Sequence, residues 1–122
     1  MIQQQFVFSV VVPCFNEASG ITQTVKEIHD ALKSFDSWEL IVVDDGSTDN
    51  SGAHLSELMT TYPRLKVCPH ARNRGYGAAL KTGIRHARSD SIAIIDADLT
   101  YPATDLARLI EEFLSRDTDM IV

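Results

Sequence analysis

The sequence predicts a three-layer α/β/α fold built on a mostly parallel sheet, and two observations support this prediction. Four short apolar runs are rich in β-branched residues and do not alternate with polar residues, which is typical of strands buried on both faces. A helical pattern follows each run, and this alternation indicates parallel strands joined by crossover helices on both faces of the sheet. The length of 122 residues allows one domain, covering residues 1–122.

The expected elements follow one another in a regular order. The strands are predicted at residues 6–12, 40–43, 65–68 and 92–95. Apolar residues recur at intervals of three and four, as on one face of a helix, at residues 21–35, 55–62, 78–87 and 106–114. Pro63 ends the second helical pattern, and Pro102 lies near the start of the fourth.

Residues 117–122 resemble the start of a fifth strand. We therefore expect this chain to be the N-terminal part of a longer protein. Without the remainder, a strand edge or an apolar helix face would stay uncovered, and we expect such an uncovered sheet edge to favour a homo-oligomer.

Composition and charge exclude several classes of protein. Hydrophobic residues make up 44% and charged residues 23% of the chain, as in ordinary globular domains. A net charge of −6 argues against a nucleic-acid-binding surface, which is normally basic. No apolar run approaches the ~20 residues that cross a bilayer, and no basic segment precedes the first apolar run as it does in a secretory signal. We therefore expect a cytoplasmic protein without a nucleic-acid partner.

The cysteines and histidines suggest neither a disulfide nor a metal site. Cys14 should follow the first strand, and Cys68 should lie in the third. In the expected strand order a whole strand separates them, which places them roughly 9–10 Å apart and beyond disulfide reach. The four histidines fit no ligand spacing and are expected at the surface or in an interface: His29, His54, His70 and His86.

The fourth apolar run ends in two carboxylates one residue apart, Asp96 and Asp98. In extended backbone, residues i and i+2 point the same way, so both carboxylates are expected on one side of the sheet edge. Hard cations such as Mg²⁺ and Mn²⁺ bind one or two carboxylates together with substrate phosphates. The pair is therefore a candidate metal site.

Acidic clusters follow three of the four predicted strands, at residues 13–17, 44–49 and 96–98. In open α/β sheets, ligands bind beyond the carboxyl ends of the strands, where the strand order reverses. Carboxylates gathered at one edge repel one another and need a cation to offset that repulsion. The sequence therefore predicts a pocket for a metal and a nucleotide at this edge.

Several residues at this edge allow two interpretations. The Asp45 carboxylate is expected to accept hydrogen bonds from a nucleobase or a ribose, whereas residues 47–49 are expected to form a turn and a helix cap. Phe15 either stacks on a base or packs in the core. Glu17 either holds a ribose or favours the positive end of the following helix.

The loop before the third helical pattern is also ambiguous. Arg72 and Arg74 face either a diphosphate or water. Three small residues in and after this loop are expected to permit a tight turn and close packing of helix on sheet: Gly75, Gly77 and Gly83.

In this order and spacing, the three acidic segments resemble the nucleotide-sugar-binding half of family-2 glycosyltransferases, which have the Rossmann-like GT-A fold. The resemblance covers essentially all 122 residues. The first-strand, second-strand and Asp-x-Asp motifs of the family correspond here to residues 11–17, 42–49 and 96–99.

The resemblance implies a role for each matching residue near the nucleoside. Pro13, Phe15 and Glu17 would border the base and the ribose. Val43 and Asp45 would meet the nucleobase.

The resemblance also implies roles near the diphosphate. Asp96, Ala97 and Asp98 would hold the ribose, the diphosphate and a Mg²⁺ or Mn²⁺ ion, with Asp98 first among the direct ligands. Asp96 and Asp98 are thus the implied catalytic and metal-binding residues.

The implied activity is metal-dependent, inverting transfer of a hexose from a nucleoside-diphosphate sugar of the UDP or GDP type. Asp-Ala-Asp-Leu at residues 96–99, followed by Pro102, is similar to dolichyl- or polyprenyl-phosphate mannose and glucose synthases. That similarity implies a polyprenyl-phosphate acceptor and peripheral contact with the cytoplasmic face of a membrane. Thr100 departs from this branch, which often has Gln there. The family's acceptor-side residues lie beyond residue 122, so we expect the chain alone to bind a donor without catalysing transfer.

Two other functions fit the sequence. One is a shortened nucleotide-binding or assembly module without catalysis. The other is a dinucleotide-binding oxidoreductase domain, because Gly75-Tyr76-Gly77 precedes a helix and Asp96 follows about 20 residues later. Leu80 replaces the third glycine of that fingerprint, and residues 70–74 separate the strand from the glycines where a tight turn is required.

Overall fold

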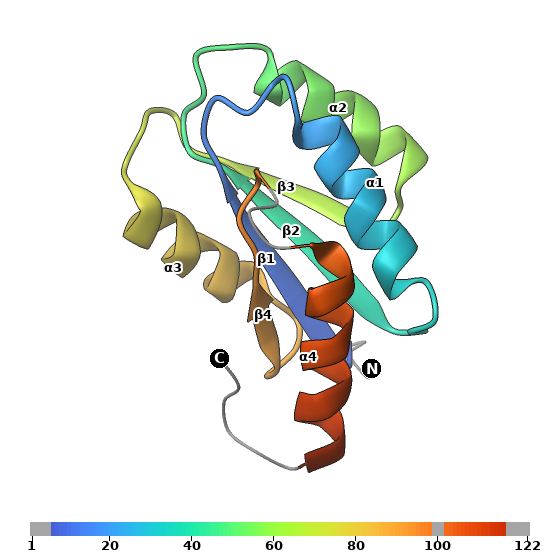
Figure 1. The fold of residues 1–122 in the computed structure, drawn as a ribbon. Helices are drawn as coiled ribbons and strands as arrows, with labels where there is room; N and C mark the ends of the chain where they lie inside the picture. The colour runs from blue at the N-terminus through green and yellow to red at the C-terminus, as the bar shows by residue number, and fades with distance from the viewer. Residues whose placement is uncertain (1–5, 99–101, 117–122) are drawn as a thin grey trace, which may run out of the picture.

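A computed structural model describes residues 6–98 and 102–116 (Figure 1). Four strands alternate with four helices, as predicted. In chain order they are β1 (Phe8–Cys14), α1 (Ile21–Leu32), β2 (Trp38–Asp44), α2 (Ser51–Thr61), β3 (Leu65–Pro69), α3 (Tyr76–His86), β4 (Ile92–Ile94) and α4 (Ala103–Arg116). The predicted fifth strand at 117–122 lies outside the described residues, as do Leu99 and Thr100.

All described strands are parallel, in the order β3-β2-β1-β4. The register aligns Cys14 of β1 with Asp44 of β2, and Asp44 with Pro69 of β3, so these three strands end at one level. The order reverses between β1 and β4, because the chain adds strands first on one side of β1 and later on the other. This reversal is where an open α/β sheet offers a ligand crevice.

Strand β1 continues two residues further than predicted, through Pro13 and Cys14. Proline lacks an N–H and usually interrupts a central strand. Here the Cys14 carbonyl faces β2 and accepts from the Asp45 N–H, while the Val11 carbonyl faces β4. Alternation therefore turns the Pro13 nitrogen toward the β4 side, where strand pairing ends at Val11 and Ile94, and no ladder bond is lost.

The helices cover the two faces of the sheet unequally. Helices α1, α2 and α4 share one face with the larger core cluster, and α3 is the one described helix that packs on β1 and β2 at the other face (Figure 1). Helix α3 approaches the sheet closely, because a Cβ at Gly83 would overlap the Val11 side chain. This contact confirms the predicted packing role of Gly83, and Gly75, with φ of 100°, provides the tight turn before α3.

A buried carboxylate lies on the α3 face of the sheet, at the end opposite the carboxyl rim. The Glu39 side chain is 1% exposed and accepts hydrogen bonds from Ser9 Oγ at 2.6 Å, from Lys66 Nζ at 2.8 Å and from the Arg88 N–H. A buried charge is costly unless it is paired in this way. Burial raises the pKa of the Glu39 carboxyl, but these three donors outweigh it, and the pKa lies below its ordinary value.

Both cysteines are free thiols, as predicted. Cys14 ends β1, Cys68 lies in β3, and β2 separates the two strands. His29, which is expected at the surface or in an interface, is not an exposed residue. Its ring is half-buried against Trp38 and Tyr62, with ring centroids 5.1 and 4.3 Å away, because one turn of α1 faces the edge of the core.

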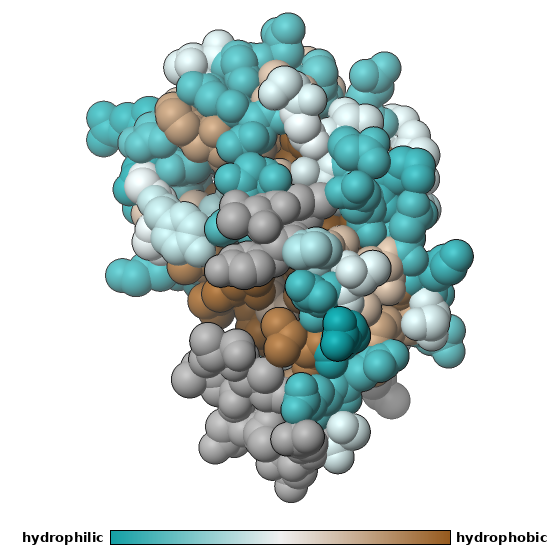
Figure 2. All heavy atoms as spheres, viewed as in Figure 1, coloured by the Kyte–Doolittle hydropathy of each residue, from teal (hydrophilic) through white to brown (hydrophobic). Residues whose placement is uncertain are grey.

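Among the described residues, β4 pairs on one side only, with β1. Ile94 on this strand is 46% exposed, and apolar side chains gather in the region of β4 and the adjoining α4 in Figure 2. The expected uncovered edge is therefore present in the described part of the chain, and the homo-oligomer remains a prediction. None of the described helices combines the length and apolar character needed to span a membrane.

Candidate functional site

A cleft of about 410 Å³ lies beyond the carboxyl ends of β1, β2 and β4, at the point where the strand order reverses. It brings together residues from separate parts of the chain, as the three acidic clusters predicted. The lining residues are Pro13, Cys14, Phe15, Glu17, Asp45, Asn73, Gly75, Tyr76, Ala79, Asp96, Ala97 and Asp98. Asp45 and Asp98 thus lie in one cleft, although 53 positions separate them in the sequence.

The Asp96 and Asp98 side chains are both exposed and line this cleft. The sequence predicts that an extended strand gives them a shared direction, but β4 ends at Ile94 and residues 97–98 form a turn. The turn is anchored from the neighbouring helix, because Thr24 Oγ of α1 donates to the Ala97 carbonyl at 2.6 Å. A hydrogen-bonded turn therefore presents the two carboxylates, in place of strand alternation.

This carboxylate pair suits a divalent cation that brings some of its own ligands. Within residues 6–98 and 102–116, no three His, Cys, Asp or Glu side chains lie close enough together to hold a metal by themselves. Mg²⁺ does not need such a cage, because it usually binds one or two carboxylates and completes its coordination with substrate phosphates and water. The donor set fits Mg²⁺ or Mn²⁺ bound together with a diphosphate.

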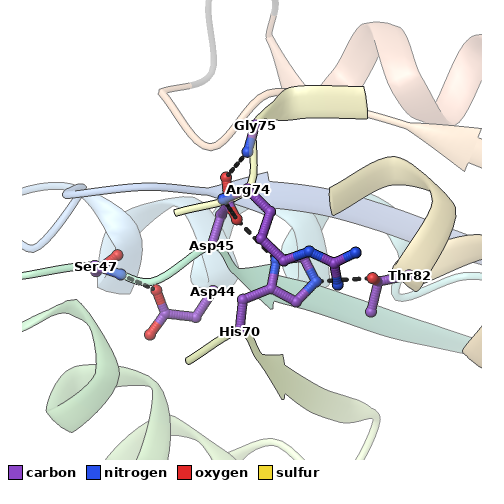
Figure 3. Close-up of polar contacts among 7 residues, drawn as sticks. All are labelled: Asp44, Asp45, Ser47, His70, Arg74, Gly75 and Thr82. Carbon is purple, nitrogen blue, oxygen red and sulfur yellow. Dashed lines mark hydrogen bonds and ion pairs between the residues drawn. The ribbon is translucent and has the colours of Figure 1, made fainter. Parts of the chain in front are cut away.

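Three donors hold the carboxylate of Asp45, one of the acids that line the cleft (Figure 3). Its side chain is 5% exposed. Oδ1 lies 2.7 Å from His70 Nδ1 and accepts from the Arg74 N–H at 2.8 Å, and Oδ2 accepts from the Gly75 N–H at 2.9 Å. Burial raises the pKa of Asp45, but the donors from His70, Arg74 and Gly75 outweigh it and hold the pKa below its ordinary value.

His70 is a residue of this site that the sequence analysis missed, since it expects His70 only at the surface or in an interface. Its side chain is 6% exposed and joins Asp45 on one side to Thr82 Oγ1 of α3 on the other, at 2.7 Å (Figure 3). His70 follows β3 directly, at the same edge as the acidic clusters. The topology argument that grouped those clusters would have found it, whereas a search for metal-ligand spacing could not.

The loops that follow β1 and β2 hold each other by hydrogen bonds. Asn16 has φ of 54°, which is uncommon outside glycine. Its side-chain carbonyl accepts from the Thr48 N–H at 2.8 Å, and its own N–H donates to Ser47 Oγ at 3.0 Å. Asp49 accepts from the Ala18 N–H. We call this group, residues 16–18 with 47–51, the loop clasp.

The loop clasp agrees with the predicted turn at residues 47–49, whereas the N-cap of α2 is Asn50, whose side chain makes no capping hydrogen bond. Asp49 Oδ1 accepts from the Ser51 N–H at the start of α2, and Ser51 Oγ accepts from the Glu17 N–H. Asn16 was not predicted. The clasp fixes the segment that contains Phe15 and Glu17, both of which line the cleft.

The structure excludes the core alternative for Phe15 and shows where Glu17 lies. Phe15 is 43% exposed and lines the cleft, so it is not a core aromatic. Glu17 also lines the cleft, and its carbonyl accepts from the N–H of Ile21, where α1 begins. The first turn of α1 contains no acidic residue, so Glu17 lies outside the helix.

Other predicted residues lie away from the cleft. Val43 is fully buried and packs toward α3 with Ala79, because strand alternation gives it the opposite direction from Asp44. Its side chain is therefore not available to a nucleobase. Arg72 and Arg74 are exposed and do not line the cleft. Tyr76, at the start of α3, lines it without having been predicted.

Comparison with known proteins agrees with this geometry. The family model for glycosyl transferase family 2 matches residues 9–122. The chain is 35% identical to a dodecaprenyl-phosphate galacturonate synthase of Rhizobium johnstonii, over 98% of this chain and 36% of that protein. It is 33% identical to a dolichol-phosphate mannosyltransferase of Pyrococcus furiosus, over 84% of this chain and 29% of that protein.

A solved structure gives the same result. A mannosyltransferase of Pyrobaculum calidifontis in complex with GDP-Man and Mn²⁺ matches with a TM-score of 0.78 and 30% identity, over 90% of this chain and 33% of that one. This likeness confirms the expected GT-A fold and gives no support to the dinucleotide-binding alternative. The chain spans about a third of the length of these relatives. Because the family model covers nearly all of it, the chain belongs to glycosyl transferase family 2.

Proposed function

We propose that the protein binds a nucleoside-diphosphate sugar in the cleft and transfers its hexose to an acceptor with inversion at the anomeric carbon. One observation supports this most directly. Asp45, which follows β2, and the Asp96–Asp98 pair, which follows β4, line one cleft together with the exposed Phe15. The cleft therefore offers a hydrogen-bond acceptor, an aromatic face and a pair of carboxylates within one ligand-sized space.

The nucleoside occupies the part of the cleft between the β1 and β2 loops. Phe15 stacks on the base, and the Asp45 carboxylate accepts an N–H of the base. Glu17 and Pro13 border the ribose. The roles of Glu17 and Pro13 are inferred from the likeness to the family and from the place of both residues in the cleft lining.

The diphosphate lies beside the turn at residues 96–98. Asp96 and Asp98 hold a Mg²⁺ or Mn²⁺ ion there, with Asp98 as the first direct ligand. When bound, the ion offsets the negative charge of the diphosphate and makes it a better leaving group. Thr24 holds the turn through the Ala97 carbonyl, so it orients both carboxylates without touching the ligand. The relative in complex with GDP-Man and Mn²⁺ supports this assignment.

The acceptor we propose is a polyprenyl phosphate. The relatives named as dodecaprenyl-phosphate and dolichol-phosphate transferases support this class. A phosphate acceptor is already an anion at neutral pH, so its attack on the anomeric carbon needs little help from a base. A lipid acceptor also requires contact with a membrane, and we propose that this contact is at the cytoplasmic face.

Calorimetry tests the donor half of this proposal. The protein is titrated with UDP, GDP and NAD, each with and without Mn²⁺. We expect one nucleoside diphosphate to bind in a metal-dependent way, and Asp98→Asn to weaken that binding by tenfold or more. Asp90→Asn is the matched control, because Asp90 is an exposed aspartate in the loop before β4, at the opposite edge of the sheet. Metal-independent binding of NAD, or equal effects of the two variants, would overturn the proposal.

A further inference from the structure

We infer that His70 is a positioning residue of the donor site, which acts through Asp45 to hold the acceptor atom that meets the nucleobase. This inference rests on the proposed function, since it requires a nucleoside in the cleft. His70 itself does not line the cleft, whereas Asp45 does. Its effect on a ligand must therefore pass through the Asp45 carboxylate.

The hydrogen bonds of Asp45 leave a defined place for a ligand. A carboxylate offers about four acceptor positions. Oδ1 uses two of them, for His70 Nδ1 and the Arg74 N–H, and Oδ2 uses one, for the Gly75 N–H. Among the described residues, no other donor reaches Oδ2, so the remaining acceptor position lies on that atom. A partial rotation of the carboxylate about its Cβ–Cγ bond would move this position.

His70 is the side chain that opposes such rotation. The other two donors are backbone N–H groups of adjacent residues, Arg74 and Gly75, in the loop between β3 and α3. His70 instead begins at the end of β3, and its own N–H donates to the Asp44 carbonyl at 2.8 Å, so its backbone is tied to β2. The ring therefore ties the carboxylate to the sheet itself.

The ring of His70 is fixed at both nitrogens. A carboxylate can only accept, so Nδ1 carries the proton that is donated to Asp45. In the neutral ring Nε2 then accepts from Thr82 Oγ1, 2.7 Å away on α3. A flipped ring would face both partners with carbon atoms, and the side chain is too buried for water to replace them. The structure thus assigns one orientation to the whole chain Asp45–His70–Thr82.

Two substitutions of His70 distinguish the contribution of Nδ1, which contacts Asp45, from that of Nε2, which contacts Thr82. The amide nitrogen of asparagine lies near the position of a histidine Nδ1, and that of glutamine lies near Nε2. His70→Asn therefore keeps a donor to Asp45, and His70→Gln keeps the contact with Thr82 and loses the donor. Because hydrogen bonds to charged groups are among the stronger ones, we expect His70→Gln to weaken nucleoside-diphosphate binding about tenfold. His70→Asn should bind within about threefold of the wild type.

A second ligand shows whether the effect reaches only the nucleoside. Inorganic pyrophosphate with Mn²⁺ tests the Asp96–Asp98 side of the cleft alone, and we expect the His70 variants to bind it as the wild type does. His54→Gln is the matched control, because His54 lies on α2 and does not line the cleft. It should leave the affinities for both ligands unchanged.

The outcomes separate this inference from the proposed function. If the wild type binds neither UDP nor GDP, the proposed function fails. If the wild type binds one of them and His70→Gln binds equally well, the inference about His70 is wrong. Equal losses for nucleotide and pyrophosphate would show a merely structural role and would also overturn it. Should His70→Gln fail to fold, Thr82→Val tests the inference instead, because it removes the hydroxyl that holds Nε2 of the His70 ring. A selective loss of nucleotide affinity supports the inference, and unchanged affinity refutes it.

Discussion

Replacing Glu39 by glutamine tests how much the buried carboxylate beneath α3 stabilises the sheet. Glu39 Oε2 accepts from Ser9 and from the Arg88 N–H, and Oε1 pairs with Lys66 Nζ. A glutamine whose oxygen keeps the first two contacts must turn its NH₂ group toward the ammonium of Lys66. The variant therefore loses one charge-assisted hydrogen bond. Lys66 is 41% exposed and can regain water, so we expect a loss of about 2 kcal/mol in the free energy of unfolding at neutral pH.

The pH dependence of this loss gives a second, sharper expectation. Folding lowers the pKa of Glu39, so its contribution is fully present above the unfolded value of 4.5 and disappears as the pH falls through the lower folded value. The stability difference between wild type and Glu39→Gln should therefore shrink as the pH drops below 4.5. Urea unfolding followed by circular dichroism measures the stability difference at neutral pH, and the same experiment at several acidic pH values measures how this difference shrinks.

Asp30→Asn is the control for this experiment, because Asp30 pairs with Lys26 on the exposed side of α1. Exposed ion pairs contribute little, so this variant should unfold like the wild type. Glu39 lies at the end of the sheet away from the cleft, and nucleotide affinity should stay unchanged in both variants. Equal stability of Glu39→Gln and wild type at neutral pH, or a difference that persists at low pH, would refute the reasoning.

Three further predictions concern packing, loop geometry and thiol chemistry. Gly83→Ala should lower the free energy of unfolding by about 1–3 kcal/mol, because its Cβ would overlap a β1 side chain. Gly77→Ala is the control, since no described atom lies within 4 Å of its Cβ, and it should not destabilise the protein in the same urea titration. Asn16→Ala should lose about 1–2 kcal/mol, because alanine disfavours the left-handed backbone there and the loop clasp loses an acceptor; unchanged stability and nucleotide affinity would contradict this role. Burial and the nearby acids raise the pKa of Cys14 to about 12, so iodoacetamide should label Cys14 more slowly than the half-buried Cys68. Mass spectrometry measures both rates, and labelling of Cys14 in the folded protein as fast as in urea would refute this prediction.

The fold and the location of the cleft follow from sequence pattern for a simple physical reason. Strands buried on both faces must be continuously apolar, and crossover helices make such strands parallel. Parallel strands end at one edge, so polar residues that follow them must gather there. The sequence pattern alone therefore predicts that Asp45 and Asp98 line one cleft.

The direction of individual side chains could not be derived in the same way. Val43 and Asp45 are two residues apart in one motif, yet Val43 packs under α3 and Asp45 lines the cleft, because β2 ends at Asp44 and alternation stops there. Asp96 and Asp98 point into the cleft through a turn held by Thr24, 73 positions from Ala97. The strand period therefore predicted correctly that this pair lies in the cleft, but it predicted an extended strand where the structure has a turn.

By itself, the sequence determined the alternation of strands and helices, the parallel sheet and the edge at which the acids gather. These properties depend on hydrophobic pattern and chain connection, which are local. Only the tertiary structure decided that α3 is the one described helix on its face, that Asn16 joins the loops after β1 and β2, and that Thr82 and Asp45 fix the ring of His70. Such contacts join residues 12–32 positions apart, and they depend on strand register and on the rotamers of side chains that meet only when the chain has folded.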